Sequence, residues 1–201
     1  DSSPAEIIDL FKQAEKEAVS EAVLQKADDQ IDKEISMLEK FNYSLPTLKS
    51  GEVAECNAKV TVESLSNSKF PKTITLDFGS GCKDSEGNFR AGKIVVHITG
   101  PYWDKNTVRH SKLVDYIYND LKVVGDRNEI NKGPNDKGYI VFEIKHTEKI
   151  SNTKGELLVE RDWDRVRTQN RGKNLLSNDD DEVWVTGKAV VENNGKEVVR
   201  E

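Results

Sequence analysis

The sequence predicts a mainly β fold, in which an N-terminal helical segment packs on a single curved antiparallel meander sheet. Apolar residues recur at helical spacing over residues 4–41, and from the mid-fifties to the C-terminus they alternate with polar residues. Turn residues join the alternating stretches without a helical pattern between them, which favours antiparallel over parallel pairing. We therefore divide the chain into a helical segment, 1–45, and an antiparallel β domain, 46–201.

The helical segment is predicted to span residues 4–41, where Ser3 and Glu6 form a capping box at its start. Its apolar positions form one stripe: Ile7, Phe11, Ala14, Ala18, Ala22, Ala27, Ile31, Ile35 and Leu38. Asp28 and Asp29 allow a break into two helices. The stripe is short for a coiled coil and rich in Ala, so we expect a helix docked on the domain rather than a stalk or a partner-binding coil.

Eight stretches carry the two-residue alternation of β-strands. They cover residues 60–63, 73–78, 94–99, 108–118, 121–130, 139–146, 156–168 and 183–191. Residues that tolerate positive φ lie in the connections 84–88, 134–138, 152–155 and 193–196. Asn194-Gly195 is the strongest hairpin signal among them. A linker, 42–55, separates these strands from the helix.

The stretch 160–168 is unusual because neither of its faces is apolar. Arg161, Trp163, Arg165 and Arg167 alternate along one face, and the other face is mainly acidic. This pattern predicts a thin sheet wetted on both sides, held by cross-strand charge pairs and cation–π contacts. The basic stripe could instead bind an anionic ligand. We favour structural pairing, because the neighbouring strands are acidic enough to neutralise the arginines.

Composition and charge exclude several classes of partner. The chain has 201 residues, of which 35% are hydrophobic and 33% are charged, with a net charge of −6. A mildly acidic protein repels nucleic acid and anionic lipid headgroups, so we expect neither as a partner. No apolar run approaches the roughly 18 residues that a membrane-spanning helix needs. Because the first residue is Asp1, we expect a processed or trimmed chain, and the absence of an export signal or anchor from this sequence is uninformative.

No motif predicts catalysis, and we expect no catalytic residue, no metal site and no cofactor. The three histidines stand too far apart in the sequence for a helical metal pair: His97, His110 and His146. Charged residues are a third of the chain, so pairs of carboxylates give no signal of glycoside chemistry. The acidic loop 84–88 and the acidic run 179–182 could hold calcium, but we expect them to be solvated turns.

The two cysteines, Cys56 and Cys82, could meet across strand ends if residues 57–64 and 72–78 form a hairpin. A bridge would close a loop of about 26 residues and stabilise the fold by roughly 3 kcal/mol. Two free buried thiols are the alternative, which we favour slightly less. Zinc is not expected, because no second Cys or His lies at ligand spacing.

Three aromatic residues are candidate ligand contacts: Tyr102, Trp103 and Trp163. Trp103 lies in a polar loop that we expect to be exposed, and exposed aromatic side chains mark binding surfaces. Together they would suit a platform for a glycan. For Tyr116, Tyr118 and Trp184 we expect packing roles instead.

Several stretches resemble uncharacterised secreted lipoproteins of Bacteroidetes-type bacteria, which carry a β-rich domain of unknown function. The similar residues are 71–79, 81–82, 92–96, 115–120, 124–125, 185–187 and 193–196. The resemblance implies an export signal and a lipid-attached cysteine upstream of the mature domain, and hence a place at the outer membrane, on the cell surface or in the periplasm. In the family pattern an upstream cysteine pairs with the equivalent of Cys82, so the resemblance implies the disulfide. It supplies no activity.

We therefore expect a non-catalytic, exported cell-envelope lipoprotein domain with a binding or structural role. Its partner would be a glycan, a peptide or another envelope protein, and only the removed lipid anchor would contact the membrane. One alternative is a periplasmic carrier of a lipid or other hydrophobic ligand, which predicts an apolar cavity between helix and sheet. Another is a glycan-binding or glycoside-acting protein. A glycan-binding protein predicts that Trp103 or Trp163 is exposed beside other aromatic residues. A glycoside-acting protein predicts carboxylates that converge in a cleft.

Overall fold

The computed structural model describes residues 4–40, 43, 56, 58–64, 69–172, 180–193 and 196–200, without the side chains of 4–11 and 191–200. One helix and ten strands lie within these residues. They are α1 (Pro4–Lys40), β1 (Lys59–Ser64), β2 (Lys72–Asp77), β3 (Cys82–Lys83), β4 (Phe89–Ile98), β5 (Val108–Tyr118), β6 (Leu121–Pro134), β7 (Ile140–Asn152), β8 (Leu157–Asn170), β9 (Glu182–Asn193) and β10 (Lys196–Arg200). The predicted fold class, a mainly β antiparallel meander with an N-terminal helix, is confirmed.

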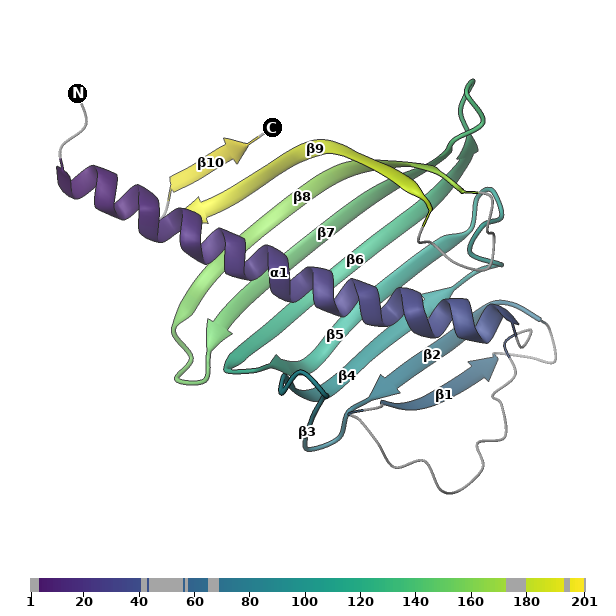
Figure 1. Cartoon of the computed structure of the whole chain (residues 1–201), viewed down its shortest axis with the longest axis horizontal. Helices are drawn as coiled ribbons and strands as arrows, with labels where there is room; N and C mark the ends of the chain where they lie inside the picture. Colours follow the sequence, from purple (N-terminus) through teal and green to yellow (C-terminus); the bar gives the residue numbers. More distant parts are fainter. Residues whose placement is uncertain are drawn as a thin grey trace.

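The strands form one sheet in the order β1-β2-β4-β5-β6-β7-β8-β9-β10, with β3 paired to β4 beside this path. All pairings are antiparallel. The sheet is open, with β1 at one edge and β10 at the other. Figure 1 shows α1 running across one face of this sheet, from the β10 side to the β1 side. We call this the helix-covered face and the opposite one the solvent face.

The helix α1 is continuous through Asp28 and Asp29, so the possible break into two helices is not observed. Its buried positions are Ser20, Val23, Leu24, Ala27, Ile31, Glu34, Ile35 and Leu38. The predicted stripe is wrong at Ala14, Ala18 and Ala22, which are exposed. Each step of four residues advances about 40° beyond a full turn, so a run of such steps leaves the buried face. No helix in the described part of the chain is both long and apolar enough to cross a membrane.

Five sequence expectations fall outside the described residues or side chains. These are the capping box of Ser3 and Glu6, the side chains of Ile7 and Phe11, most of the linker 42–55, the Asn194-Gly195 turn and Asp179.

The core lies between α1 and the helix-covered face. Alternation is strict on β7, where every second residue from Phe142 to Ile150 is buried. The core includes Ile74, Leu76, Ile94, Val96, Ile98, Tyr116, Val123 and Val159. Arg161 and Trp163 also point to this face and are 7% and 6% exposed. The prediction that this part of the sheet is wetted on both sides is therefore wrong, because α1 covers one side of it.

The predicted bridge between Cys56 and Cys82 is present, with a Cα–Cα distance of 5.1 Å. It ties the segment before β1 to β3, and Cys56 packs in the core. Its 26-residue separation predicts that the bridge stabilises the fold by about 3 kcal/mol, because it restricts the unfolded chain.

The Cys56→Ser, Cys82→Ser double variant should therefore lose about 3 kcal/mol of unfolding free energy in urea titrations. Adding dithiothreitol should lower the stability of the wild type to a similar extent and leave the double variant unchanged. A loss below about 1 kcal/mol would show that the bridge contributes little to the fold.

Candidate functional site

A cavity of about 630 Å³ lies between α1 and the helix-covered face of strands β6 to β9. Its volume is in the range of sites for small molecules. The apolar part of its lining comes from Leu24, Ile35, Tyr102, Trp103, Ile144, Trp163, Val183 and Val185. The charged part comes from both the helix and the sheet, so the lining is amphiphilic.

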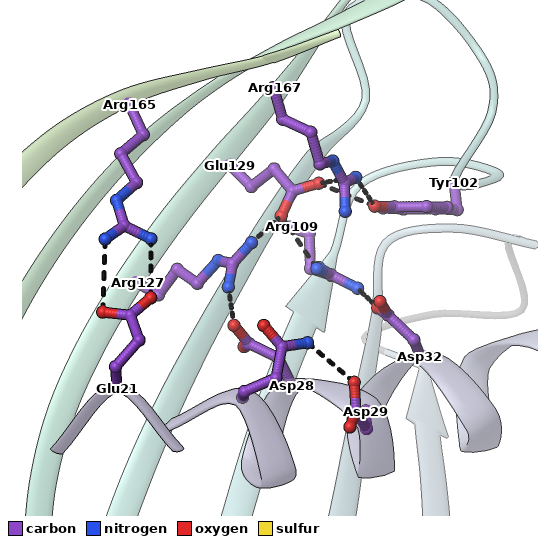
Figure 2. Close-up of polar contacts among 11 residues, drawn as sticks. Glu21, Asp28, Asp29, Asp32, Tyr102, Arg109, Arg127, Glu129, Arg165 and Arg167 are labelled. Carbon is purple, nitrogen blue, oxygen red and sulfur yellow. Dashed lines mark hydrogen bonds and ion pairs between the residues drawn. The ribbon is translucent and has the colours of Figure 1, made fainter. Parts of the chain in front are cut away.

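The two walls of the cavity carry mainly opposite charge, with Lys40 on the helix side and Asp181 beside β9 as exceptions. From α1, the acidic residues Glu21, Asp28, Asp32 and Glu39 line it. From the sheet, the basic residues Arg127 on β6 and Arg165 and Arg167 on β8 line it. Figure 2 shows the carboxylates of Glu21, Asp28 and Asp32 reaching from the helix towards guanidinium groups on the strands. Carboxylates of the helix form ion pairs with guanidinium groups of the sheet, as in Asp28–Arg127 and Glu21–Arg165.

Glu129 on β6 is the centre of the larger group of pairs, and it is 1% exposed. It accepts hydrogen bonds from Arg109 at 2.8 Å, Arg127 at 2.9 Å and Arg167 at 2.8 Å. The hydroxyl of Tyr102 donates to the same carboxylate at 2.7 Å. Burial by itself raises the pKa of Glu129, but the three guanidinium groups outweigh it and hold the pKa well below its usual range.

The helix contributes further carboxylates to the same arginines. Asp28 pairs with Arg127, and Asp32 pairs with Arg109. Burial raises the pKa of Asp28, and the Arg127 guanidinium opposes this effect. Two arginines that interact with the buried Glu129 are therefore also held by α1.

A smaller group of pairs lies further towards the N-terminal half of α1. The Ser20 hydroxyl donates to Glu148 at 2.9 Å, and Arg161 donates both to Glu148 and, at 3.1 Å, to Ser20. Burial raises the pKa of Glu148 to about 7, although Arg161 and Ser20 act in the opposite direction. Arg161 also reaches Glu21 at 3.3 Å.

The carboxylates that neutralise the basic stripe of β8 come largely from α1 and from buried positions on β6 and β7, namely Glu21, Glu129 and Glu148. Structural pairing is therefore observed, but the predicted source of the acidic groups was incomplete. A signal for the helix partners exists in the sequence. Asp28 and Asp32 are four residues apart, so they share one helix face with Glu21, seven residues before Asp28.

The three predicted ligand-contact aromatics, Tyr102, Trp103 and Trp163, all line the cavity. Tyr102 and Trp163 are 7% and 6% exposed, and Trp103 is half-buried, so the expectation of an exposed Trp103 is only partly met. Tyr102 stacks on Phe142 with centroids 5.3 Å apart, and Trp103 meets Tyr102 edge-on at 5.0 Å. Arg171 lies 4.0 Å from the centre of the Trp103 ring.

Trp163 does not form an open platform, because other groups cover its ring. His146 stacks against it with centroids 5.3 Å apart, and the guanidinium carbon of Arg165 lies 3.2 Å from its centre. Burial, together with nearby arginines, lowers the pKa of His146 to about 3, so this histidine is neutral at pH 7. Trp184, for which packing was predicted, stacks on Tyr139 at 5.4 Å and remains 46% exposed.

The other candidate residues engage in local contacts. His97 lies 3.4 Å from the Thr73 hydroxyl, and His110 lies 2.7 Å from Asp126. In the loop 84–88, Asp84 accepts backbone hydrogen bonds from Glu86 and Asn88 and pairs with Arg90 at 3.3 Å, as expected for a turn. Among the described residues, no cluster of three or more His, Cys, Asp or Glu could hold a metal ion.

The geometry of the site is thus that of a half-polar, half-apolar cavity, walled by paired charges and covered by one helix. Comparisons of the chain with models of protein families, with curated proteins and with solved structures found no match.

Proposed function

We propose that the protein is a non-catalytic, exported cell-envelope domain that binds a small amphiphilic ligand between α1 and the sheet. The observation that carries this proposal is the cavity of about 630 Å³, lined by both apolar and charged side chains. A ligand of matching character would bury apolar surface and keep polar partners, which is the usual basis of small-molecule binding. The disulfide agrees with export, because such bonds persist in oxidising compartments.

The apolar wall on β9 supports binding rather than a purely structural role. Val183 and Val185 line the cavity and are 50% and 51% exposed. Exposed apolar residues that adjoin a cavity gain free energy when a ligand covers them, by about 25 cal/mol for each Å² buried. A ligand lying on these valines would stabilise the complex in this way.

The charged wall distinguishes this proposal from a carrier of purely hydrophobic molecules. Arg127, Arg165 and Arg167 lie on the same cavity surface as the valines. Contact with only an alkyl chain would remove water from these groups without replacing its hydrogen bonds, at a cost in free energy. We therefore favour a ligand with a polar end. A glycan is less well supported at this cavity, because the Trp163 ring is covered by His146 and Arg165.

Filling the cavity tests the proposal. The uncharged fluorescent probe N-phenyl-1-naphthylamine should bind the wild type saturably, at one site per chain. Val185→Trp should weaken this binding about tenfold or more, because the indole ring occupies part of the cavity and leaves too little space for the probe.

Val124→Trp is the matched control. Val124 lies on β6, is 47% exposed and does not line the cavity, so this variant should bind the probe like the wild type. Equal binding by the wild type and both variants would place the probe elsewhere and contradict the proposal. Absence of saturable binding would contradict it as well.

A further inference from the structure

The arginines around the cavity differ in how firmly their charge is already neutralised. Arg109, Arg127 and Arg167 all donate to the buried Glu129. Arg165 pairs with Glu21 instead, and the two side chains are 29% and 44% exposed. An ion pair this accessible contributes little free energy, whereas a buried pair is costly to break. Of the ion pairs formed by these four arginines, Arg165–Glu21 is therefore the one that a ligand can most easily replace.

The guanidinium of Arg165 already holds a carboxylate. Its two terminal nitrogens donate to the two oxygens of Glu21 at 3.1 and 3.3 Å, which is the two-point geometry that arginine offers to carboxylates and phosphates. The ring of Trp163, 3.2 Å away, supports the guanidinium from one side. In Figure 2 the dashed lines from Arg165 run only to Glu21, whereas those of Arg109, Arg127 and Arg167 meet at Glu129. The anion-binding group is thus held in place before any ligand arrives.

The apolar wall begins next to this group. On β9, Gly187 is opposite Arg165, Val185 is opposite Arg167 and Val183 is opposite Gln169. A Cβ at Gly187 would lie 2.3 Å from the carbonyl oxygen of Asp164 and 2.8 Å from Cα of Arg165, so the glycine lets β9 approach the β8 backbone closely beside Arg165. The two exposed valines then continue along the strand away from Arg165. This arrangement suits a head group at Arg165 and an apolar chain along Val185 and Val183.

We propose, building on the function proposed above, that the ligand is an amphiphile with an anionic head group, which replaces the Glu21 carboxylate on Arg165. Glu21 then occupies the site as an internal competitor when no ligand is present. Being 44% exposed, it can turn to solvent after displacement. Arg161, its other partner, keeps Ser20 and Glu148. Carboxylate and phosphate head groups share the chemistry that this site recognises. The proposal departs from the expectation drawn from the net charge of −6, because the guanidinium group at the site acts on the head group at much shorter range.

The experiment compares three probes by displacement of N-phenyl-1-naphthylamine at pH 7.5: dodecanoate below its critical micelle concentration, uncharged 1-dodecanol and acetate. Glu21→Gln should bind dodecanoate about two- to fivefold more tightly, since an exposed competing ion pair has been removed. Arg165→Gln should bind it about tenfold or more weakly, since a charge-assisted hydrogen bond is lost. In both variants the affinity for 1-dodecanol should change much less than the affinity for dodecanoate, because an uncharged head group does not replace the Glu21 carboxylate, and acetate should not displace the probe. Dodecyl phosphate should follow the pattern of dodecanoate.

Glu15→Gln is the matched control, because Glu15 is an exposed glutamate of the same helix and does not line the cavity. Its dodecanoate affinity should equal that of the wild type. Unchanged dodecanoate affinity in both Glu21→Gln and Arg165→Gln, with folding verified by circular dichroism, would overturn the anionic head group. If 1-dodecanol still bound and Val185→Trp still blocked it, the proposed function would stand without this inference. If no probe bound, both would fail.

Discussion

Replacing Glu129 by glutamine is expected to lower the free energy of unfolding by about 3–5 kcal/mol. The carboxylate is 1% exposed and serves Arg109, Arg127 and Arg167 at once. Glutamine keeps the shape of the side chain but leaves the buried guanidinium group of Arg109 and the partly buried ones of Arg127 and Arg167 without their central anion. Since domains are stable by only about 5–15 kcal/mol in total, this single change removes a large fraction of the stability. Urea titration followed by far-UV circular dichroism measures it.

The matched control is Glu143→Gln on the solvent face of β7. Glu143 is 54% exposed and pairs with Lys132 at 3.2 Å, so its replacement should cost less than about 1 kcal/mol. Similar losses in the two variants would show that the group around Glu129 does not stabilise the fold. If Glu129→Gln does not fold, Glu129→Asp is the second variant, because it keeps the negative charge on a shorter side chain. It should fold, and its free energy of unfolding should be lower than that of Glu143→Gln.

The positions of the strands could be predicted from the sequence, because they depend on a local pattern of alternating apolar and polar residues. Each of the eight predicted strands overlaps a strand of the sheet, because alternation is a property of neighbouring residues. The first half of β4 was missed. There the register with β5 shifts at Gly92, whose φ is 81° and whose Cβ would lie 2.1 Å from the carbonyl oxygen of Asp115. Such a bulge interrupts the alternation that reveals a strand.

The candidate site depends on contacts that no local pattern contains. Arg109 and Asp32 are 77 positions apart in the chain, and Arg165 and Glu21 are 144 apart. Alternating arginines on a strand ordinarily indicate a solvated face, because charged residues are almost never fully buried unless paired. Here carboxylates of the helix, together with Glu129 and Glu148 of the sheet, supply the pairing groups, and the helix covers the arginines together with them. The cavity aromatics were identified from residue type, whereas their degree of burial depended on where α1 crosses the sheet.

The stability of the fold should depend on pH through two buried groups with opposite effects. Burial lowers the pKa of His146 to about 3. Between pH 6.5 and about 3 its imidazole is therefore neutral in the folded chain, whereas in the unfolded chain it is protonated. The contribution of His146 is therefore complete above pH 6.5 and falls by about 1.4 kcal/mol for each pH unit below it. By pH 4.5 the loss is about 3 kcal/mol.

Glu148 acts in the other direction. Burial raises its pKa to about 7, so the folded chain retains this proton below pH 7 while the unfolded chain releases it above about pH 4.5. The folded state is therefore favoured as the pH falls from 7 to 4.5, by about 3 kcal/mol over that range. In the wild type the two contributions largely cancel between pH 6.5 and 4.5.

Removing one group at a time should reveal the contribution of the other. Acidification from pH 7 to 4.5 should stabilise His146→Asn by about 3 kcal/mol relative to the wild type, and destabilise Glu148→Gln by a similar amount. The double variant should follow the wild type, because both titrations are then absent. Urea unfolding at several pH values measures these differences. Parallel pH profiles for the wild type and both single variants would mean that neither side chain is as strongly desolvated by α1 as its burial indicates.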